Sequence, residues 1–128
     1  GGERNPNYDG VFVFDNDFPA LLIDSAPPPS DDLFRAEPAT GRCRVICFSP
    51  DHGASLPDLS PEAREAVVDA WCAEAEALGR EFPSVQIFEN KGAAMGASNP
   101  HPHGQVWATS YVPDELAVED RQQRAWWD

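Results

Sequence analysis

The chain has 128 residues, of which 41% are hydrophobic, and its formal net charge is −13 at pH 7. This length suits one domain with a single core, and the charge excludes nucleic acids and anionic membranes as expected partners, because proteins bind both through Lys and Arg. No run approaches the roughly 20 apolar residues of a membrane span, and the first residues have no secretory character. The odd count of three cysteines favours a reducing cytoplasm over a disulfide scaffold. We therefore expect one cytoplasmic domain over residues 1–128.

The first third of the chain predicts strands and one loop. Residues 11–14 are short, apolar and aromatic, as in a strand, and a polar turn follows them. Residues 21–23 are predicted as a second strand. The proline-rich run 26–32 cannot be a helix or a central strand, so we expect a surface loop there. Residues 42–48 are predicted as the next strand.

The three cysteines are predicted to be free thiols in the core. Cys43 and Cys47 are four residues apart, which is within loose zinc-ligand spacing. On a strand, however, both face the same side, and buried thiols are the favoured interpretation. Cys72 falls in a helical stretch next to Trp71, and we expect it in the core as well.

One long helix is predicted in the middle of the chain. Ser60 is a good N-cap and Pro61 suits the first helical position, while Gly79 and Pro83 mark the end. The apolar residues at helical spacing are Ala63, Val67, Ala70, Trp71 and Leu78. Charged residues occupy the other face, so the helix is predicted to pack on the core and to carry no chemistry.

The last part of the chain predicts two further strands and a second helix. The strands are residues 85–90 and 103–112, and a Gly/Ala-rich turn over 91–99 separates them. The helix begins after Pro113 and has acidic residues at its positive end. Strands with one long helix between them predict an antiparallel α+β domain.

Residues 99–105 carry most of the information about function. Pro102 pushes His101 into an extended conformation. In an extended chain His101, His103 and Gln105 project from one face. Two imidazoles and an amide that are held rigidly in a row suit a nucleophile or a metal ligand.

Further motifs surround this run, and they are residues 5–8, 16–18, 47–52, 56–60, 88–98 and 106–110. Together they resemble the galactose-1-phosphate uridylyltransferases, the transferase branch of the histidine-triad superfamily. Several ordered motifs are far more specific than one short match. The resemblance implies a histidine-triad-like half-barrel with an antiparallel sheet, one long helix and a C-terminal helix. It also implies that the chain is an internal part of the N-terminal half, without the start of that half and without the C-terminal half.

The resemblance implies a ping-pong exchange of UMP between UDP-glucose and galactose 1-phosphate in galactose metabolism. His103 matches the nucleophile that attacks the α-phosphorus and carries the uridylyl group. For this role one ring nitrogen must be free and the other anchored by a hydrogen bond. Gln105 stands where the hydrolase branch has a third histidine. Because an amide donates a hydrogen bond but supplies no proton, Gln105 favours transfer over hydrolysis.

The expected substrate-binding residues are Asn16, Asp17, Asn90, Gly96, Ala97, Ser98 and Gln105. Gly96, Ala97 and Ser98 form a turn with the backbone N–H groups and hydroxyl of an anion-binding nest. The resemblance places the other residues against the nucleotide sugar. A carboxylate such as that of Asp17 suits a ribose diol, because it accepts two hydroxyl hydrogen bonds.

Metal sites are also implied by the resemblance. His52 and His101 match ligands of a structural zinc, which the family completes with a Cys-x-x-Cys pair upstream of this chain. Two imidazoles fall short of the four ligands that zinc prefers, so we expect an incomplete site here. Glu119 matches a ligand of a second metal, iron or zinc, whose remaining ligands lie in the other half. The complete protein is expected to be a homodimer in which the partner completes each active site.

Two alternatives stay open. The first is a histidine-triad nucleotide hydrolase or phosphorylase, which Gln105 disfavours. The second is a catalytically incomplete fragment that folds and binds nucleotide and metal but has little or no turnover.

Overall fold

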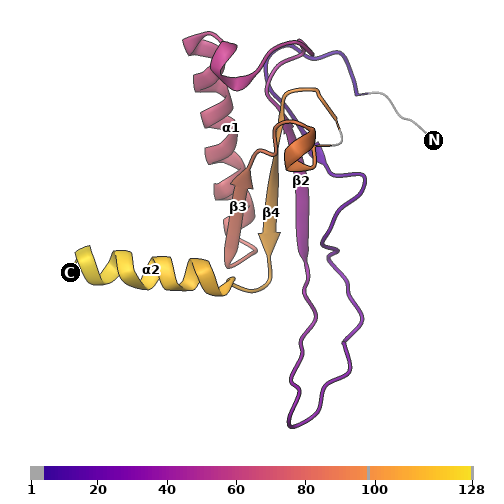
Figure 1. The fold of residues 1–128 in the computed structure, drawn as a ribbon, viewed down its shortest axis with the longest axis vertical. Coiled ribbons are helices and arrows are strands. Elements are labelled where there is room, and N and C mark those ends of the chain that lie inside the picture. Colours follow the sequence, from indigo (N-terminus) through magenta and orange to yellow (C-terminus); the bar gives the residue numbers. More distant parts are fainter. Residues whose placement is uncertain (1–4, 98, 128) are drawn as a thin grey trace.

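A four-stranded antiparallel sheet forms the centre of the structure (Figure 1). The structure is a computed structural model, and it describes residues 5–97 and 99–127. The strands are β1 (Phe12–Asp15), β2 (Gly41–Cys47), β3 (Ser84–Phe88) and β4 (His103–Thr109). They lie in the order β1-β2-β4-β3, and each neighbouring pair is antiparallel. The prediction of an antiparallel α+β fold is therefore confirmed.

Two helices accompany the sheet. The first, α1 (Pro61–Gly79), lies along one side of the sheet, whereas α2 (Asp114–Trp127) points away from the end of β4 (Figure 1). As predicted, Ser60 is the N-cap of α1, and its hydroxyl accepts a 3.2 Å hydrogen bond from the backbone N–H of Ala63. None of the helices in the described part of the chain is long and apolar enough to cross a membrane.

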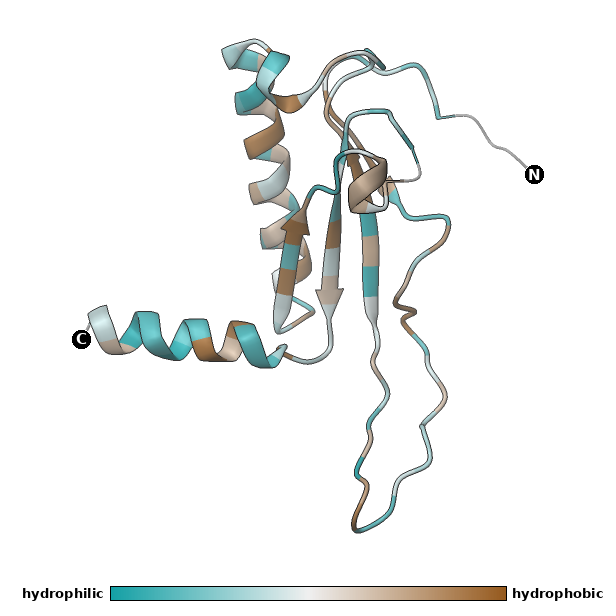
Figure 2. Cartoon of the chain, viewed as in Figure 1, coloured by the Kyte–Doolittle hydropathy of each residue, from teal (hydrophilic) through white to brown (hydrophobic). Residues whose placement is uncertain are grey.

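The core lies between α1 and one face of the sheet. Hydrophobic and hydrophilic positions alternate along the strands (Figure 2), so that each strand presents one apolar row to α1. The largest fully buried side chains are Ile46, Phe48, Val67 and Val106. The ring of Phe48 packs edge-on against Trp71 of α1, with ring centroids 6.2 Å apart. The opposite face of the sheet is consequently available for a binding site.

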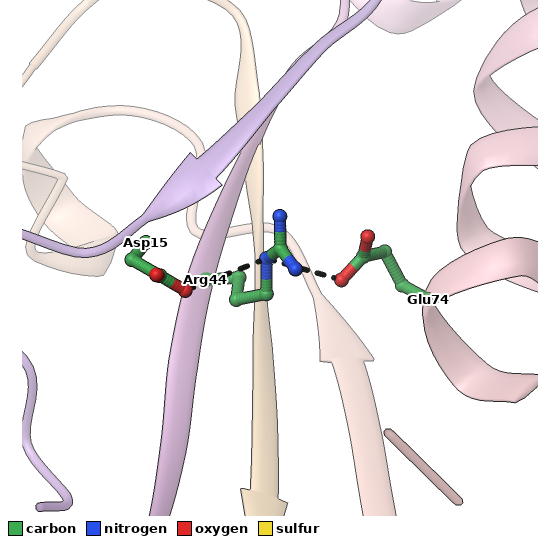
Figure 3. A network of polar contacts seen from close by, with 3 residues as sticks. All are labelled: Asp15, Arg44 and Glu74. Carbon is green, nitrogen blue, oxygen red and sulfur yellow. Dashed lines mark ion pairs between the residues drawn. The ribbon is translucent and has the colours of Figure 1, made fainter. Parts of the chain in front are cut away.

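A polar network joins three elements at the edge of this core. Arg44 of β2 extends between Asp15 at the end of β1 and Glu74 of α1 (Figure 3). Its Nε atom lies 3.2 Å from a carboxylate oxygen of Glu74 and 3.7 Å from one of Asp15. Only 12% of the Glu74 side chain is exposed, against 76% for Asp15. The pair with Glu74 is therefore the less hydrated of the two.

The predicted strand over residues 21–23 is wrong. These residues lie in the irregular connection between β1 and β2, and Leu22 and Ile23 are exposed. The backbone N–H of Gly41 does bond to the carbonyl of Leu22, at 2.9 Å. This is a single bond: β1 pairs with β2 only over residues 44–47, and residues 21–23 do not follow the open edge beside Gly41 far enough to form a ladder. The proline-rich run 26–32 is irregular and mostly exposed, as predicted.

The placement of Cys72 in the core is also wrong, although Cys43 and Cys47 are buried as expected. Cys72 follows the buried Val67 by five residues, which is a rotation of about 140° around a helix. Its side chain therefore lies on the solvent side of α1. The last strand ends at Thr109 and not at residue 112, because Gly41 and Ser84 are the final partners on its two sides.

Candidate functional site

A cavity of about 690 Å³ opens on the face of the sheet opposite α1. The lining includes six of the residues predicted from the sequence, which are Asn16, Asp17, His52, His101, His103 and Gln105. Strand β4 supplies the last two, the turn after β1 supplies the first two, and the loops before β4 and after β2 supply the others. The fold thus brings together residues that are widely separated in the chain.

His103 has the tautomer that a nucleophile requires. Its Nδ1 atom lies 2.7 Å from the backbone carbonyl oxygen of His101. Because a carbonyl only accepts hydrogen bonds, Nδ1 must carry the proton. The lone pair of the ring is then on Nε2, and the half-buried ring lines the cavity.

Gln105 has its amide oriented by a neighbour on the same face of β4. The indole N–H of Trp107 donates to Oε1 of Gln105 at 3.3 Å, and Trp107 itself packs edge-on against Phe88. With its oxygen engaged, Gln105 keeps its NH₂ group for an acceptor in the cavity. Gly104 between the two site residues faces the core, where a Cβ would lie 3.0 Å from the ring of Phe48.

Tyr8 connects the N-terminal segment to the two predicted zinc ligands. Its hydroxyl lies 2.8 Å from Nε2 of His101 and 3.2 Å from the carbonyl oxygen of Ser49. Since that carbonyl only accepts, the tyrosine proton goes to Ser49, and Nε2–H of His101 donates to the tyrosine oxygen. His101 then presents its Nδ1 lone pair toward Nδ1 of His52, 2.9 Å away.

The His52–His101 pair offers two ligands to a metal. Two nitrogens on one tetrahedral zinc lie roughly 3.3 Å apart, which is close to the 2.9 Å between these Nδ1 atoms. Burial, followed by the nearby His52 and His103, lowers the pKa of His101 and keeps it in the neutral form that binds metals. In residues 5–97 and 99–127 no third His, Cys, Asp or Glu joins the pair. The described residues therefore fit half of a zinc site.

A second cavity, of about 280 Å³, lies beside the first and shares Asn99, His101 and His103 with it. The predicted residues Asn90 and Ala97 line this second cavity.

Two of the three residues of the predicted anion nest have their backbone donors engaged elsewhere. Gly96 has φ +80°, and its N–H donates to Ala93, while the N–H of Ala97 donates to Gly92. Those donors are therefore engaged within the turn itself. Ser98, the third member of the predicted nest, lies outside the described residues. Glu119 is exposed on α2 and lines neither cavity.

Sequence reasoning gave no role to several residues of the larger cavity. Register places Phe14, Val45 and Gln105 side by side across β1, β2 and β4, and all three line the cavity. Cys47 is buried there as well, beside Tyr8. Burial, followed by the neighbouring Cys47, raises the pKa of Tyr8 to about 12. The alternation along residues 12–14 and 43–47 was the available signal, because it puts these side chains on the face of Gln105.

Comparison with known proteins defines the class of protein. Residues 1–113 match the family described as galactose-1-phosphate uridyl transferase, N-terminal domain. The chain belongs to this family, as the resemblance in the sequence indicated.

Individual relatives with high sequence identity carry the name of one enzyme. The chain is 55% identical over 127 residues to the galactose-1-phosphate uridylyltransferase of Rattus norvegicus, covering 98% of this chain and 34% of the relative. It is 55% identical over 125 residues to the enzyme of the same name from Haemophilus influenzae, covering 96% and 36%. The chain thus spans about a third of the length of these curated relatives.

Solved structures share the fold. A uridylyltransferase structure superposes with a TM-score of 0.77 at 26% identity, covering 92% of this chain and 39% of the other. An ADP-glucose phosphorylase from Arabidopsis thaliana with bound ADP-glucose gives a TM-score of 0.71 at 27% identity, covering 90% and 36%.

Proposed function

We propose that the protein containing this chain transfers a uridylyl group between UDP-glucose and galactose 1-phosphate, through a covalent intermediate on His103. Membership of the family and the names of the relatives support this assignment. The observation that carries it is the tautomer of one side chain and the orientation of another on the same face of β4. His103 has a free Nε2 lone pair, and Gln105 directs an amide NH₂ group toward the same cavity.

The chemistry follows from these two groups. Nε2 of His103 attacks the α-phosphorus, a P–N bond forms, and the P–O bond to glucose 1-phosphate breaks. The leaving oxygen belongs to a phosphate whose second pKa is about 6, so it departs as an anion and needs no proton donor. The hydrogen bond to the His101 carbonyl stabilises the charge that develops on the imidazole. Attack by a phosphate oxygen of galactose 1-phosphate then restores the free histidine.

Gln105 distinguishes transfer from hydrolysis in this scheme. Its NH₂ group donates to a phosphoryl oxygen in both half-reactions, which stabilises the transition state. Water is a poorer nucleophile than a phosphate anion and would benefit from a proton-transfer group. An amide cannot serve as one, so the intermediate persists until a sugar phosphate arrives.

The metals, the assembly and the location belong to the same proposal. His52 and His101 would hold a structural zinc, with the remaining ligands from elsewhere in the complete protein. Glu119 would contribute to a second site for iron or zinc. The complete protein would act as a cytoplasmic homodimer whose partner subunit completes the acceptor site. The three free cysteines support a reducing location.

Covalent labelling of the chain tests the central step. UDP-glucose carrying carbon-14 in its uracil ring should leave a label that is stable to base and labile to acid, as expected for a phosphoramidate. Peptide mapping should place this label on His103. His103→Ala should lose the label entirely, whereas His52→Asn should retain labelling in the fraction that folds. A label on another residue, or its persistence in His103→Ala, would contradict the assignment.

The likeness to an ADP-glucose phosphorylase favours one alternative, in which inorganic phosphate accepts the nucleotidyl group. The same assay separates the two activities. Labelled ADP-glucose should label His103 poorly, and added phosphate should not discharge the label faster than galactose 1-phosphate does. The reverse result would assign the chain to the phosphorylase reaction. For the isolated chain we expect nucleotide binding with little turnover, because positioning by the missing half can be worth about 7–11 kcal/mol of the barrier.

A further inference from the structure

The smaller cavity contains a cation that no part of the assignment above uses. The protein has nine Lys and Arg residues against 22 Asp and Glu. Of those in the described part of the chain, only Lys91 lines either of the two cavities. It is also the sole lysine of the sequence. A strongly acidic protein thus places a single positive charge beside its nucleophile.

Most of the other described cations are engaged far from this place. Arg44 pairs with Glu74, Arg80 with Glu76 and Arg124 with Asp120. Arg64 donates to backbone carbonyls at the start of α1. Lys91, in contrast, forms no ion pair with any carboxylate of residues 5–97 and 99–127. Hydrogen bonds with Ser55, and then the nearby Lys91, lower the pKa of Asp58, but no ion pair within the described residues holds the Lys91 ammonium group, which remains available to an anionic ligand.

The position of His103 defines which part of a ligand would reach Lys91. His103 lies in the walls of both cavities. The larger cavity has the volume and the mixed lining that suit a nucleoside. With the reacting phosphorus at His103, the remainder of a nucleotide sugar extends into the smaller cavity. That remainder begins with the distal phosphate.

The loop around Lys91 favours a charged contact. The backbone donors of Gly96 and Ala97 are already bonded within the loop, and Glu89 also lines the cavity. A phosphate there would meet a carboxylate. The positive charge of Lys91 offsets that repulsion.

We propose that Lys91 binds the distal phosphate of the nucleotide sugar, which is the phosphate of the hexose 1-phosphate after transfer. This inference rests on the proposed function and adds a residue that positions the leaving and accepting phosphate. Lys91 acts on this group alone, because the nucleoside and its α-phosphate lie on the other side of His103. A charge-assisted contact of this kind discriminates UDP-glucose from UMP.

Isothermal titration calorimetry of the 128-residue chain tests the proposal with UDP-glucose, glucose 1-phosphate and UMP. Lys91→Gln should weaken the binding of UDP-glucose and of glucose 1-phosphate about tenfold, and it should change UMP affinity less than about twofold. Lys91→Arg should retain most of the affinity. Arg121→Gln is the matched control, since it removes one positive charge from α2, away from both cavities.

The outcomes separate this proposal from the one on which it rests. Lys91→Gln with wild-type affinity for UDP-glucose would overturn the role of Lys91 and leave the proposed function intact. An equal loss of affinity for UMP would also overturn the role of Lys91 and leave the proposed function intact, because the charge would then act on the α-phosphate. An equal loss in Arg121→Gln would show that net charge, and not a local contact, sets the affinity. Wild-type chain that binds none of the three ligands would overturn both proposals.

Discussion

The Nδ1 atom of His103 lies 2.7 Å from the backbone carbonyl oxygen of His101, so the backbone of one histidine sets the tautomer of the other. The ring of His101 in turn contacts Tyr8 and His52. The same residue therefore orients the proposed nucleophile through its main chain and the proposed metal-ligand pair through its side chain. Changes at the Tyr8 end of this chain of contacts are expected to reach His103.

Replacing Gln105 by histidine should shorten the life of the covalent intermediate. An imidazole at this position can move a proton to or from water, and general acid–base catalysis of this kind contributes about a hundredfold or more. We expect UMP release from the labelled chain to rise by about that factor. The measurement is the decay of the labelled histidine, with Gln105→Asn as a control that keeps an amide. An unchanged decay rate would remove Gln105 from the explanation of transfer over hydrolysis.

Tyr8→Phe should free the ring of His101. The hydroxyl bonds to both His101 and the carbonyl of Ser49, and its loss leaves buried groups without partners at a cost of about 1–3 kcal/mol. Nitrogen-15 spectra should show His101 changing from the Nε2–H tautomer to a mixture. Zinc affinity should fall about tenfold or more, as for other changes behind a metal ligand. Tyr111→Phe is the control, because Tyr111 is 46% exposed and lies outside both cavities.

The stability of the fold should decline at high pH because of Tyr8. Its pKa is raised from 10.0 to about 12, first by burial and then by the neighbouring Cys47. The unfolded chain therefore loses this proton at lower pH than the folded chain does. The stabilisation is complete below pH 10 and is lost as the pH rises toward 12.

Urea unfolding at several pH values between 9 and 12 measures this effect. The decline should be smaller in Tyr8→Phe, which has no proton to lose at this position. Equal slopes in the two proteins would show that Tyr8 titrates alike in the folded and unfolded chains.

The two carboxylates beside Arg44 should differ in their contribution to stability. Glu74→Ala leaves Arg44 without its closer partner in a place where only 26% of the arginine side chain is exposed, and we expect a loss of about 2 kcal/mol. Asp15→Ala removes an exposed partner and should cost about 0.5 kcal/mol or less. Denaturant midpoints of both variants give the comparison. Equal losses would mean that the pair with Glu74 is as well hydrated as the surface pair.

Much of the fold follows from local signals in the sequence. The N-cap at Ser60 and the 3.6-residue period predict α1 with its correct start and its buried positions Val67 and Leu78. Alternation predicts the four strands to within a few residues. Residues 21–23 have the composition of a strand, but only one backbone bond, from Gly41 to Leu22, joins them to β2 in the described part of the chain. The path of a loop past a strand is a tertiary property that local composition does not encode.

The candidate site likewise has some features that the sequence predicts and others that it does not. His101, His103 and Gln105 belong to one extended run, so their common face is predictable from spacing. The contact of Tyr8 with His101 joins residues that are 93 positions apart, and no local sequence pattern predicts it. The engagement of the Gly96 and Ala97 donors within their own turn was likewise not predictable, because glycine-rich turns of similar composition either expose or use these groups.

The free-standing α2 helix has a practical consequence for work with the isolated chain. It has no buried residue, and Trp126 and Trp127 near its end are 84% and 83% exposed. Two adjacent indoles favour contact between copies, while the net charge of −13 drives the copies apart. Salt shortens the range of that repulsion from about 10 Å at 0.1 M to about 3 Å at 1 M and leaves apolar attraction in place. Concentrated salt therefore promotes clustering of the chain, and dilute buffer keeps it dispersed.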